Sequence, residues 1–432
     1  MKVLMFGWEF PPHISGGLGT ACYGLTKGLA GIDDIQVIFV VPKAYGDEGQ
    51  SAMQLIGANN IPVAKKTIQF NDLQKKIDYY EVNSEIIPYT APDEFWQLKN
   101  KKYSGKAPFI ETDEKGRINF SGAYGPGLLN EIWNYSVVAD IIARENKFDL
   151  IHAHDWLAYP AGIAAKKRSG KPLVIHVHAT DFDRSGGNVN PQVYAIEREG
   201  MEAADQVITV SNLTRSIVIE KYGIPPDKIT TVYNAVEPPG REGKKIKKKG
   251  VNEKIVTFLG RITIQKGPEY FVEAACKVLQ KTDNVRFVMA GSGDMMDAMV
   301  RRAAELKIAD KFHFTGFLRG DEVFTMLNMS DVFVMPSVSE PFGIVPLEAM
   351  QSNVPVILSK QSGVSEILKH AIKVDFWDIN AMADAIYALV TYPALPEFFI
   401  KHGKTEAGSL KWKNSAENVK KVYYKAIGIT AE

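Results

Sequence analysis

One strand–loop–helix segment in the carboxyl-terminal half constrains the fold of this chain more than any other. Residues 332–335 form a short apolar run, Val-Phe-Val-Met, which is typical of a buried strand in a parallel sheet. Pro336 ends the run, and the sequence Glu-Pro-Phe-Gly at 340–343 cannot continue it. A helix is predicted to begin near Ile344, because Pro346 is tolerated in a first turn. This order indicates an open parallel α/β sheet, in which ligands bind beyond the carboxyl ends of the strands.

Two carboxylates flank the junction between this loop and its helix, namely Glu340 in the loop and Glu348 on the helix. The backbone N–H groups at the start of a helix have no intrahelical partner, and with the helix dipole they favour phosphate oxygens. A carboxylate accepts hydrogen bonds from sugar hydroxyls. The junction therefore suits a ligand with hydroxyls at one end and phosphate at the other, whereas a capped helix with two solvated acids is the alternative.

Size and composition are those of a soluble globular protein with two domains. The 432 residues are 45% hydrophobic and 23% charged, and the formal net charge of +1 gives no global field for nucleic acid or anionic membrane. The two cysteines, Cys22 and Cys276, predict no disulfide framework, which favours a reducing compartment. No apolar stretch is long enough for a membrane span or a secretory signal, so we expect a cytoplasmic protein.

The amino-terminal half begins with the same strand–loop–helix order. An apolar strand at 3–6 precedes a loop with Gly16 and Gly17, and a helix is predicted from about 21 to 30. Paired glycines let the backbone approach a bulky ligand and present N–H groups to it, or else they serve a tight turn that needs positive φ. The loop lacks the G-x-G-x-x-G spacing of dinucleotide-binding folds, so a nicotinamide cofactor is disfavoured.

Two later strands of this half carry a repeated His-x-His pattern, with His152 and His154 in one and His176 and His178 in the other. A period of two places both histidines of a strand on one side of the sheet. The later member of each pair lies nearer the carboxyl end and hence nearer the expected ligand. Hydrogen-bonded core histidines are favoured for His152 and His176. A metal site is the alternative, since imidazole and carboxylate are common ligands, but it is disfavoured because the sequence has neither a helical His-x-x-x-His nor a cysteine pair, and no metal is expected.

Residues 42–127 have weak periodicity and many aromatic side chains among polar ones. A long insertion with a small core of its own explains most of them, and a platform that stacks on acceptor sugar rings is the alternative. The aromatic residues are Tyr79, Tyr80, Tyr89, Phe95, Trp96, Tyr103 and Tyr124.

The second half follows a stretch rich in Pro, Gly and Lys at 237–250, which is predicted to be an exposed linker. An apolar strand at 254–259 then leads into a loop that carries Arg261 and Lys266. Two fixed cations close to a helix start can neutralise a diphosphate, and Arg offers a bidentate fork. Ordinary surface cations are the alternative.

These motifs resemble, in kind and in order, those of the retaining GT-B glycosyltransferases. The chain is most similar to the family 4 sugar transferases and the family 5 glycogen and starch synthases. The spacing of Glu340 and Glu348 resembles their donor-site signature, and Arg261 with Lys266 resembles their Arg…Lys-Gly pair. The resemblance implies an α/β fold of the GT-B type, with two Rossmann-like domains facing across a cleft.

The resemblance also implies roles for residues of both halves. Gly16 and Gly17 resemble the Gly-Gly-Leu loop of glycogen synthases, which touches the donor pyrophosphate and sugar. Asp155 is implied to lie near the reaction centre, and His178 to contact the donor sugar. The implied catalytic residues are His178, Asp155, Arg261, Lys266 and Glu340. The implied donor-binding residues are Gly16, Gly17, Asn234, Phe317, Phe342, Gly343, Ile344 and Glu348. For Asn234 an Asx-turn, and for Phe317 simple packing, are the alternatives.

The implied domains are an acceptor-side domain at 1–236, a linker at 237–250 and a nucleotide-sugar domain at 251–414. A helix at about 415–432 is implied to return to the first domain.

The implied reaction is retaining transfer of a hexose, with glucose favoured, from UDP-glucose or ADP-glucose to a glycan. Elongation of an α-1,4-glucan is favoured, with no metal and no cofactor apart from the donor. Ile14 and Ala179 stand where glycogen synthases usually carry lysine and often asparagine, which points toward family 4. A family 4 transferase for a cell-surface polysaccharide or glycolipid is therefore the alternative enzyme. A non-catalytic sugar-binding protein is disfavoured because the charged site looks intact, and homo-oligomerisation is left open.

Overall fold

A computed structural model gives the fold, and it describes residues 1–13, 16–48, 53–63, 112–125, 127–237 and 252–429. Ile14, nearly all of the predicted linker and six of the seven predicted aromatic residues (Tyr79, Tyr80, Tyr89, Phe95, Trp96 and Tyr103) lie outside these residues. The seventh, Tyr124, is buried, with 6% of its surface exposed. A buried ring of this kind serves a core rather than an open platform for sugar.

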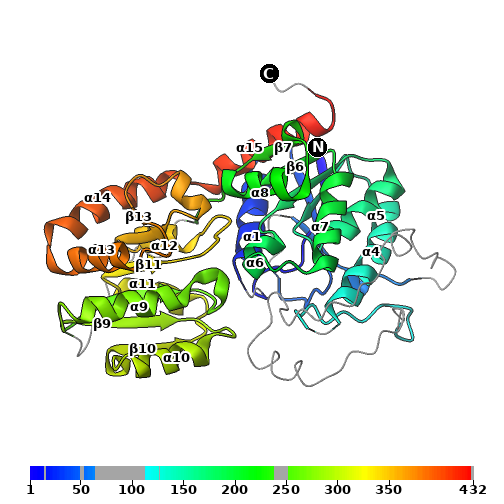
Figure 1. Cartoon of the computed structure of the whole chain (residues 1–432). Helices are drawn as coiled ribbons and strands as arrows, with labels where there is room; N and C mark the ends of the chain where they lie inside the picture. Colours follow the sequence, from blue (N-terminus) through cyan, green and yellow to red (C-terminus); the bar gives the residue numbers. More distant parts are fainter. Residues whose placement is uncertain (14–15, 49–52, 64–111, 126, 238–251, 430–432) are drawn as a thin grey trace. The chain divides into compact units, whose positions relative to one another are not determined.

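The chain divides into two compact units, which Figure 1 colours along the sequence. The first unit contains Met1–Phe182, Gly187–Asn234 and Trp412–Glu432, and the second contains Asp183–Gly186 and Ala235–Lys411. The end of the chain therefore belongs to the same unit as its beginning.

The first unit is built on a seven-stranded parallel sheet with the order β3-β2-β1-β4-β5-β6-β7. Its strands are β1 (Lys2–Phe6), β2 (Gln36–Val41), β3 (Gln54–Gly57), β4 (Leu150–His154), β5 (Leu173–Val177), β6 (Gln206–Thr209) and β7 (Ile229–Thr231). From β1 the next strands in sequence, β2 and β3, are added toward one edge of the sheet, and from β4 the later strands are added toward the other edge. The loops after β1 and β4 therefore lead in opposite directions at the carboxyl ends of these strands. Such a switch point is where doubly wound sheets bind ligands.

Helices cover both faces of this sheet, which explains why its strands are continuous apolar runs. The helices are α1 (Gly17–Ala30), α4 (Leu128–Glu145), α5 (Tyr159–Ser169), α6 (Asp181–Ser185), α7 (Pro191–Ala203), α8 (Asn212–Tyr222) and α15 (Trp412–Ala426). Helix α1 begins at Gly17, so the predicted start at about residue 21 is wrong. Leu18 and Gly19 are buried, and this packing overrides the poor helix propensity of glycine. Helix α15 packs on α1, where Gly24 leaves room for the ring of Trp412.

The second unit is built on a six-stranded parallel sheet with the order β10-β9-β8-β11-β12-β13. Its strands are β8 (Lys254–Leu259), β9 (Val285–Ala290), β10 (Phe312–Gly316), β11 (Val332–Met335), β12 (Val356–Ser359) and β13 (Ile372–Val374). Here the switch point lies between β8 and β11. The apolar run predicted to be a strand at 332–335 is β11, which is confirmed.

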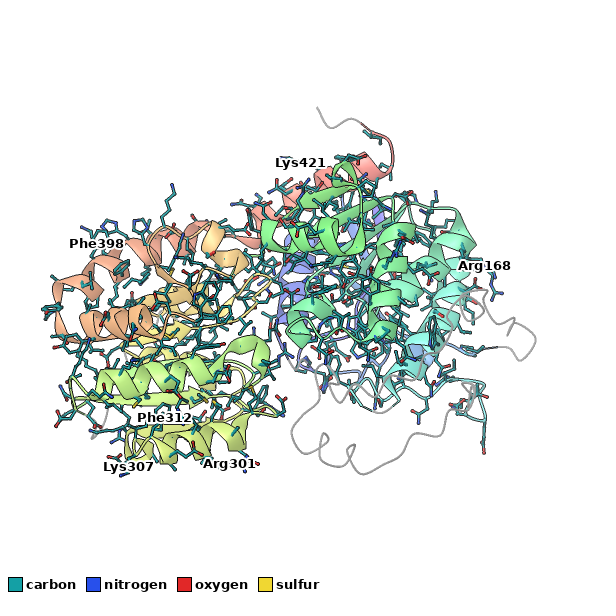
Figure 2. The ribbon with its side chains drawn as sticks, viewed as in Figure 1. Arg168, Arg301, Lys307, Phe312, Phe398 and Lys421 are labelled. Carbon is teal, nitrogen blue, oxygen red and sulfur yellow. The ribbon has the colours of Figure 1, made fainter. Side chains whose placement is uncertain are left out.

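The helices of the second unit are α9 (Pro268–Leu279), α10 (Met296–Glu305), α11 (Asp321–Met329), α12 (Val345–Gln351), α13 (Ile379–Thr391) and α14 (Ala394–Ser409). The predicted helix near Ile344 is α12, with Ile344 as its N-cap and Pro346 in its first turn. Phe312 lies in the core of this unit, whereas Phe398 on α14 is 51% exposed (Figure 2).

Charged side chains cover the outer surface of both units. Arg168, at the end of α5, donates two hydrogen bonds to the carboxylate of Asp140 at 2.8 and 2.7 Å. Arg301, Lys307 and Lys421 also lie on the surface (Figure 2). Among the helices of the described ranges, none combines the length and the apolar character that a membrane span requires.

Candidate functional site

Three loops of the second unit are joined beyond the carboxyl ends of their strands. They are the loops at 260–267 after β8, at 336–344 after β11 and at 360–364 after β12. Val338 N–H donates to the carbonyl of Gln265 at 2.9 Å. On the other side, Glu340 N–H donates to the carbonyl of Gln361, and Gly363 N–H donates to the carbonyl of Glu340, both at 2.9 Å. The loop after β11 is therefore fixed from both sides at the switch point.

Lys266 and Glu340 form an ion pair across two of these loops. Lys266 Nζ donates to Glu340 Oε2, and the same oxygen accepts from Ser337 Oγ at 3.2 Å. The side chains are 20% and 9% exposed, so the pair is more shielded from water than a surface salt bridge. The structure thus brings together two of the predicted catalytic residues, and it adds Ser337, which sequence reasoning missed.

Arg261 is the second cation of this loop cluster. Its Nη2 donates to Gln265 Oε1 at 3.0 Å, and Gln265 Nε2 donates to the carbonyl of Ser339 at 3.1 Å. Burial raises the pKa of the nearby Asp294 carboxyl, and the charge of Arg261 partly offsets this effect. Gln265 is buried and positions the guanidinium, but a glutamine inside a loop carries no sequence pattern that would have revealed it.

Two glycines are required by the backbone of these loops. Gly267 has a φ of +62°, and a side chain there would overlap the carbonyl oxygen of Pro336. Gly343 has a φ of +98° and lies against the side chains of Met335 and Glu340. Since L-residues with a side chain rarely adopt such φ angles, these glycines allow the chain to turn into α9 and α12.

Glu348 lies in the first turn of α12 and is partly buried. Burial raises the pKa of its carboxyl to about 7, so both protonation states are present near neutral pH. The ring of Phe342 is buried, and its carbonyl accepts from Val364 N–H at 2.8 Å. Phe342 thus contributes to the packing of the loop with its side chain.

Phe317 and Asn234 follow strands other than those that carry this loop cluster. Phe317 follows β10, the edge strand of the second sheet, and its ring is 46% exposed with the Arg319 guanidinium 5.5 Å from its centroid. Asn234 follows β7 in the first unit and is buried.

In the first unit, Gly16 and Gly17 stand at the start of α1 and are exposed. Gly16 has an extended φ of −176°, and Gly17 is not among the glycines with positive φ. A positive-φ turn was the alternative explanation for this pair, and it is wrong. A Cβ at either position would meet no atom of the described chain within 4 Å. Packing within the described residues therefore does not require glycine at either position.

Asp155 follows β4 directly and is fully buried. Its φ is +60°, a conformation that aspartate tolerates better than most residues but that still stores strain. Its Oδ1 accepts from Ala179 N–H at 3.4 Å, which ties it to the segment that carries His178. The structure therefore brings Asp155 and His178 together at the carboxyl edge of the first sheet.

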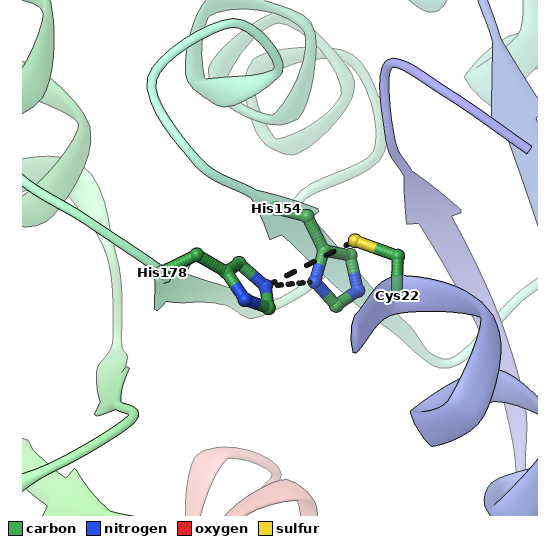
Figure 3. A group of neighbouring side chains, drawn as sticks. All are labelled: Cys22, His154 and His178. Carbon is green, nitrogen blue, oxygen red and sulfur yellow. Dashed lines mark hydrogen bonds between the residues drawn. The ribbon is translucent and has the colours of Figure 1, made fainter. Parts of the chain in front are cut away.

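The two histidines of β4, His176 of β5 and His178 directly after β5 form one buried cluster, as their period of two predicts. His178 Nε2 lies 2.9 Å from His154 Nδ1 and 3.9 Å from the sulfur of Cys22 (Figure 3). Burial lowers the pKa of His178 to about 3, so the imidazole is neutral at physiological pH. Burial raises the pKa of the Cys22 thiol, and the charges of Asp155 and Glu9 raise it further. Sequence reasoning missed Cys22 as a contact of His178.

The prediction of hydrogen-bonded core histidines is confirmed for one residue and wrong for another. His152 Nδ1 lies 2.7 Å from the hydroxyl of Tyr423 on α15. His176 is buried as predicted, but neither of its ring nitrogens has a hydrogen-bond partner in the described chain. The rings that stack on it are the imidazoles of the other three histidines.

Two family profiles match consecutive parts of the chain. The family described as "Glycosyltransferase Family 4" matches residues 105–238, and "Glycosyl transferases group 1" matches residues 241–406. The two parallel α/β units define the class of fold, which is that of the GT-B glycosyltransferases.

Relatives cover almost the whole chain. An uncharacterised glycosyltransferase of Methanocaldococcus jannaschii is 27% identical over 98% of both chains. A glycogen synthase of Mycobacterium tuberculosis is 23% identical over 99% of this chain and 95% of its own. The sucrose-phosphate synthase of Thermosynechococcus elongatus has a similar fold, with a TM-score of 0.70 at 16% identity and 99% coverage of both chains. An Anabaena protein solved with UDP and glucose has a TM-score of 0.66 at 15% identity, covering 98% of this chain and all of its own. Together, the two profile matches, the relatives and the shared fold support a glycosyltransferase with the GT-B fold, of the family 4 and family 5 type.

Proposed function

We propose that this enzyme is a retaining hexosyltransferase that transfers glucose from UDP-glucose or ADP-glucose to an α-1,4-glucan in the cytoplasm. The observation that carries the proposal is the pairing of Lys266 with Glu340, beside Arg261, at the switch point of the second sheet. Cations and a hydroxyl-binding carboxylate are thereby held at the place where such sheets bind ligands. The similarity to a glycogen synthase over nearly the whole chain supports the acceptor, and the UDP and glucose bound by the Anabaena protein support the donor.

The donor diphosphate is proposed to bind the loops of the second unit. Arg261 and Lys266 neutralise its oxygens, and the N–H groups that follow Gly343 at the start of α12 donate to it. Glu340 accepts from hydroxyls of the sugar, and Glu348 accepts from hydroxyls of the ribose. From the first unit, Gly16 and Gly17 are proposed to present their amides to the donor, since both are exposed at the start of α1.

The reaction is proposed to retain the configuration of the anomeric carbon. The bond from this carbon to the diphosphate oxygen breaks, and its electron pair remains on the diphosphate. The acceptor hydroxyl attacks the same face, and its proton passes to the departing phosphate oxygen. Arg261 and Lys266 stabilise the charge that develops on the diphosphate, without a metal ion. His178, as a neutral imidazole, and Asp155 are proposed to hold the sugar while its carbon carries positive charge.

A family 4 transferase that builds a cell-surface polysaccharide or glycolipid is the second candidate. It is favoured by Ala179, which follows His178 where glycogen synthases often have asparagine. The match of residues 105–238 to the family 4 profile supports it as well.

A panel of donors and acceptors tests the proposal. The purified enzyme is incubated with UDP-glucose or ADP-glucose and with glycogen or a lipid extract, and labelled product and released nucleoside diphosphate are measured. We expect glucan-dependent release and an α-linked product by NMR. A product formed only with lipid would favour the second candidate. Failure of every nucleotide sugar and acceptor to react would contradict both.

Variants of the loop cluster test the site. We expect Lys266→Ala to lower kcat by about 10²–10³-fold, the effect of removing one donor that stabilises developing negative charge. The matched control is Lys277→Ala, because Lys277 is an exposed lysine on α9 of the same unit. Turnover of Lys266→Ala equal to that of Lys277→Ala at saturating donor would rule out this role for Lys266.

A further inference from the structure

The histidine cluster of the first unit contains buried polar atoms that the proposed transfer reaction does not explain. Five ring nitrogens have no hydrogen-bond partner in the described chain; they are His152 Nε2, His154 Nε2, both nitrogens of His176, and His178 Nδ1. A buried polar atom without a partner costs free energy, so such atoms in a native fold call for a bound ion or water. Their concentration in one place points to a ligand.

Three of these histidines can hold one ion together. One ring nitrogen from each of His152, His154 and His176 lies within 4.8 Å of those of the other two. The ring centroids are 4.1, 5.4 and 5.3 Å apart. Zinc binds imidazole nitrogen at about 2.0–2.1 Å, so two nitrogens on one tetrahedral ion lie about 3.3 Å apart. The nitrogens therefore have to approach one another by at most about 1.5 Å to share one ion, which is 4.8 Å less about 3.3 Å.

The opposite nitrogens of two of these rings are already held. His152 Nδ1 contacts the Tyr423 hydroxyl at 2.7 Å, and His154 Nδ1 contacts His178 Nε2 at 2.9 Å. Each ring thus has Nδ1 engaged and Nε2 without a partner in the described chain. A histidine that binds a metal characteristically has its other nitrogen fixed by a second group in this way, which sets its tautomer and orientation.

We propose that His152, His154 and His176 bind a late first-row divalent metal ion, with zinc as the ion that fits best. Three neutral imidazoles suit such an ion, whereas calcium and magnesium prefer oxygen ligands. The ligands stand on β4 and β5, which pair directly with His154 opposite His176. The ion would tie these two strands together and, through Tyr423, anchor α15 to them.

A neighbouring group, Cys22 with His154 and His178, is also compact enough to bind an ion. It is the weaker candidate, because His154 Nδ1 and His178 Nε2 already satisfy each other (Figure 3). With the ion on His154 Nε2, His154 Nδ1–H donates to His178 Nε2. The proton of the neutral His178 ring is then on Nδ1. The metal site thereby fixes the tautomer of His178, although it does not depend on the role of His178 in transfer.

Metal content and spectroscopy test this inference independently of activity. The full chain is purified without a histidine tag, and its metal content is measured by mass spectrometry before and after refolding with Zn²⁺. We expect about one zinc per chain for the wild type and none for His176→Gln. The Tyr423→Phe variant keeps the packed ring but removes the hydroxyl from His152. Loss of the hydroxyl that fixes the other nitrogen of a metal-binding histidine should weaken zinc affinity by about 10–100-fold.

Cobalt distinguishes the two ligand sets. The Co²⁺ form of the wild type should have visible ligand-field bands without a thiolate charge-transfer band, and Cys22→Ser should leave this spectrum and the stoichiometry unchanged. A thiolate band, or loss of metal in Cys22→Ser, would assign the ion to the other group and overturn the proposal. A wild-type chain that takes up no zinc or cobalt on refolding would equally overturn it, leaving the cluster as packed imidazoles.

Discussion

Lys266 and Glu340 balance each other's charge, so the proposed donor diphosphate has to compete with the Glu340 carboxylate for Lys266. If Lys266 leaves the ion pair to bind phosphate, the Glu340 carboxylate can accept hydrogen bonds from sugar hydroxyls. One ion pair can thus couple recognition of the two ends of a nucleotide sugar. Arg261 does not depend on this exchange, because Gln265 holds its guanidinium.

Glu348 gives a pH-dependent prediction at the same scale. Its folded-state pKa of about 7 lies above the ordinary 4.5, so the folded protein favours the protonated acid. Glu348 therefore does not reduce the free energy of unfolding below about pH 4.5. Between about pH 4.5 and 7 the free energy of unfolding falls, because the carboxyl ionises more readily in the unfolded chain. The loss is at most about 3 kcal/mol, since partial access to water reduces it. Glu348→Gln should raise the melting temperature at pH 8 but much less at pH 5.

The control for this variant is Glu114→Gln, at an exposed acid of the first unit. Thermal unfolding of both variants and the wild type at the two pH values measures the effect. The prediction fails if Glu348→Gln is no more stable than the wild type at pH 8. Because Glu348 is also proposed to bind ribose, the same variant should raise the KM for the donor.

At the scale of the element, α1 presents two contrasting glycines. Gly17 stands at its exposed first turn, where a Cβ would meet no atom of the described chain within 4 Å. Gly24 lies in the middle of the helix, where a Cβ would overlap the ring of Trp412. The sequence alone does not distinguish them, yet Gly24 leaves space for a neighbouring helix, whereas Gly17 is proposed to serve the donor.

Alanine substitution separates these two roles. Gly17→Ala should leave the free energy of unfolding within about 1 kcal/mol of the wild type, because alanine is the better helix former. It should raise the KM for the nucleotide sugar about tenfold, which corresponds to 1.4 kcal/mol of binding. Gly24→Ala should lower the stability by about 1–3 kcal/mol through overpacking. Unchanged donor kinetics in a stable Gly17→Ala variant would argue against a ligand at this helix start.

Sequence reasoning predicted well the strands whose residues are buried on both faces of a sheet. The runs at 3–6 and 332–335 are strands because parallel sheets covered by helices need continuous apolar segments. The predicted start of α1 lies four residues too late, because propensity disfavours glycine whereas the burial of Leu18 and Gly19 favours the earlier start. The contacts of Gln265 and Cys22 were not predictable, because they join segments far apart in sequence. Resemblance to a family supplied most of the site residues, including Glu340, Lys266 and His178.

At the scale of the whole molecule, α15 completes the first unit from the far end of the sequence. Trp412 is 5% exposed against α1, and Tyr423 is fully buried beside His152. We expect Trp412→Ala to destabilise the first unit by about 3–5 kcal/mol, the usual effect of removing a buried aromatic side chain. Hydrogen exchange should show faster exchange in α1 and the first sheet, with protection of the second sheet retained.

Trp377→Ala is the matched control, because Trp377 is 57% exposed in the second unit. It should change the free energy of unfolding by less than about 0.5 kcal/mol. Equal loss of protection in both sheets of Trp412→Ala would mean that α15 stabilises the molecule as a whole, contrary to this prediction.

The placement of α15 has a consequence for how the protein is made. During synthesis on the ribosome, the first sheet emerges long before residues 412–426. Until then α1 lacks the indole ring of Trp412, which fills the space beside Gly24. The second unit, whose strands lie between 254 and 374 and whose core also contains Met382, Ile386 and Leu389 on α13, is complete before α15 is made. The amino-terminal unit, although first to be translated, is therefore the last to be finished, and a truncated product would carry it in an incomplete state.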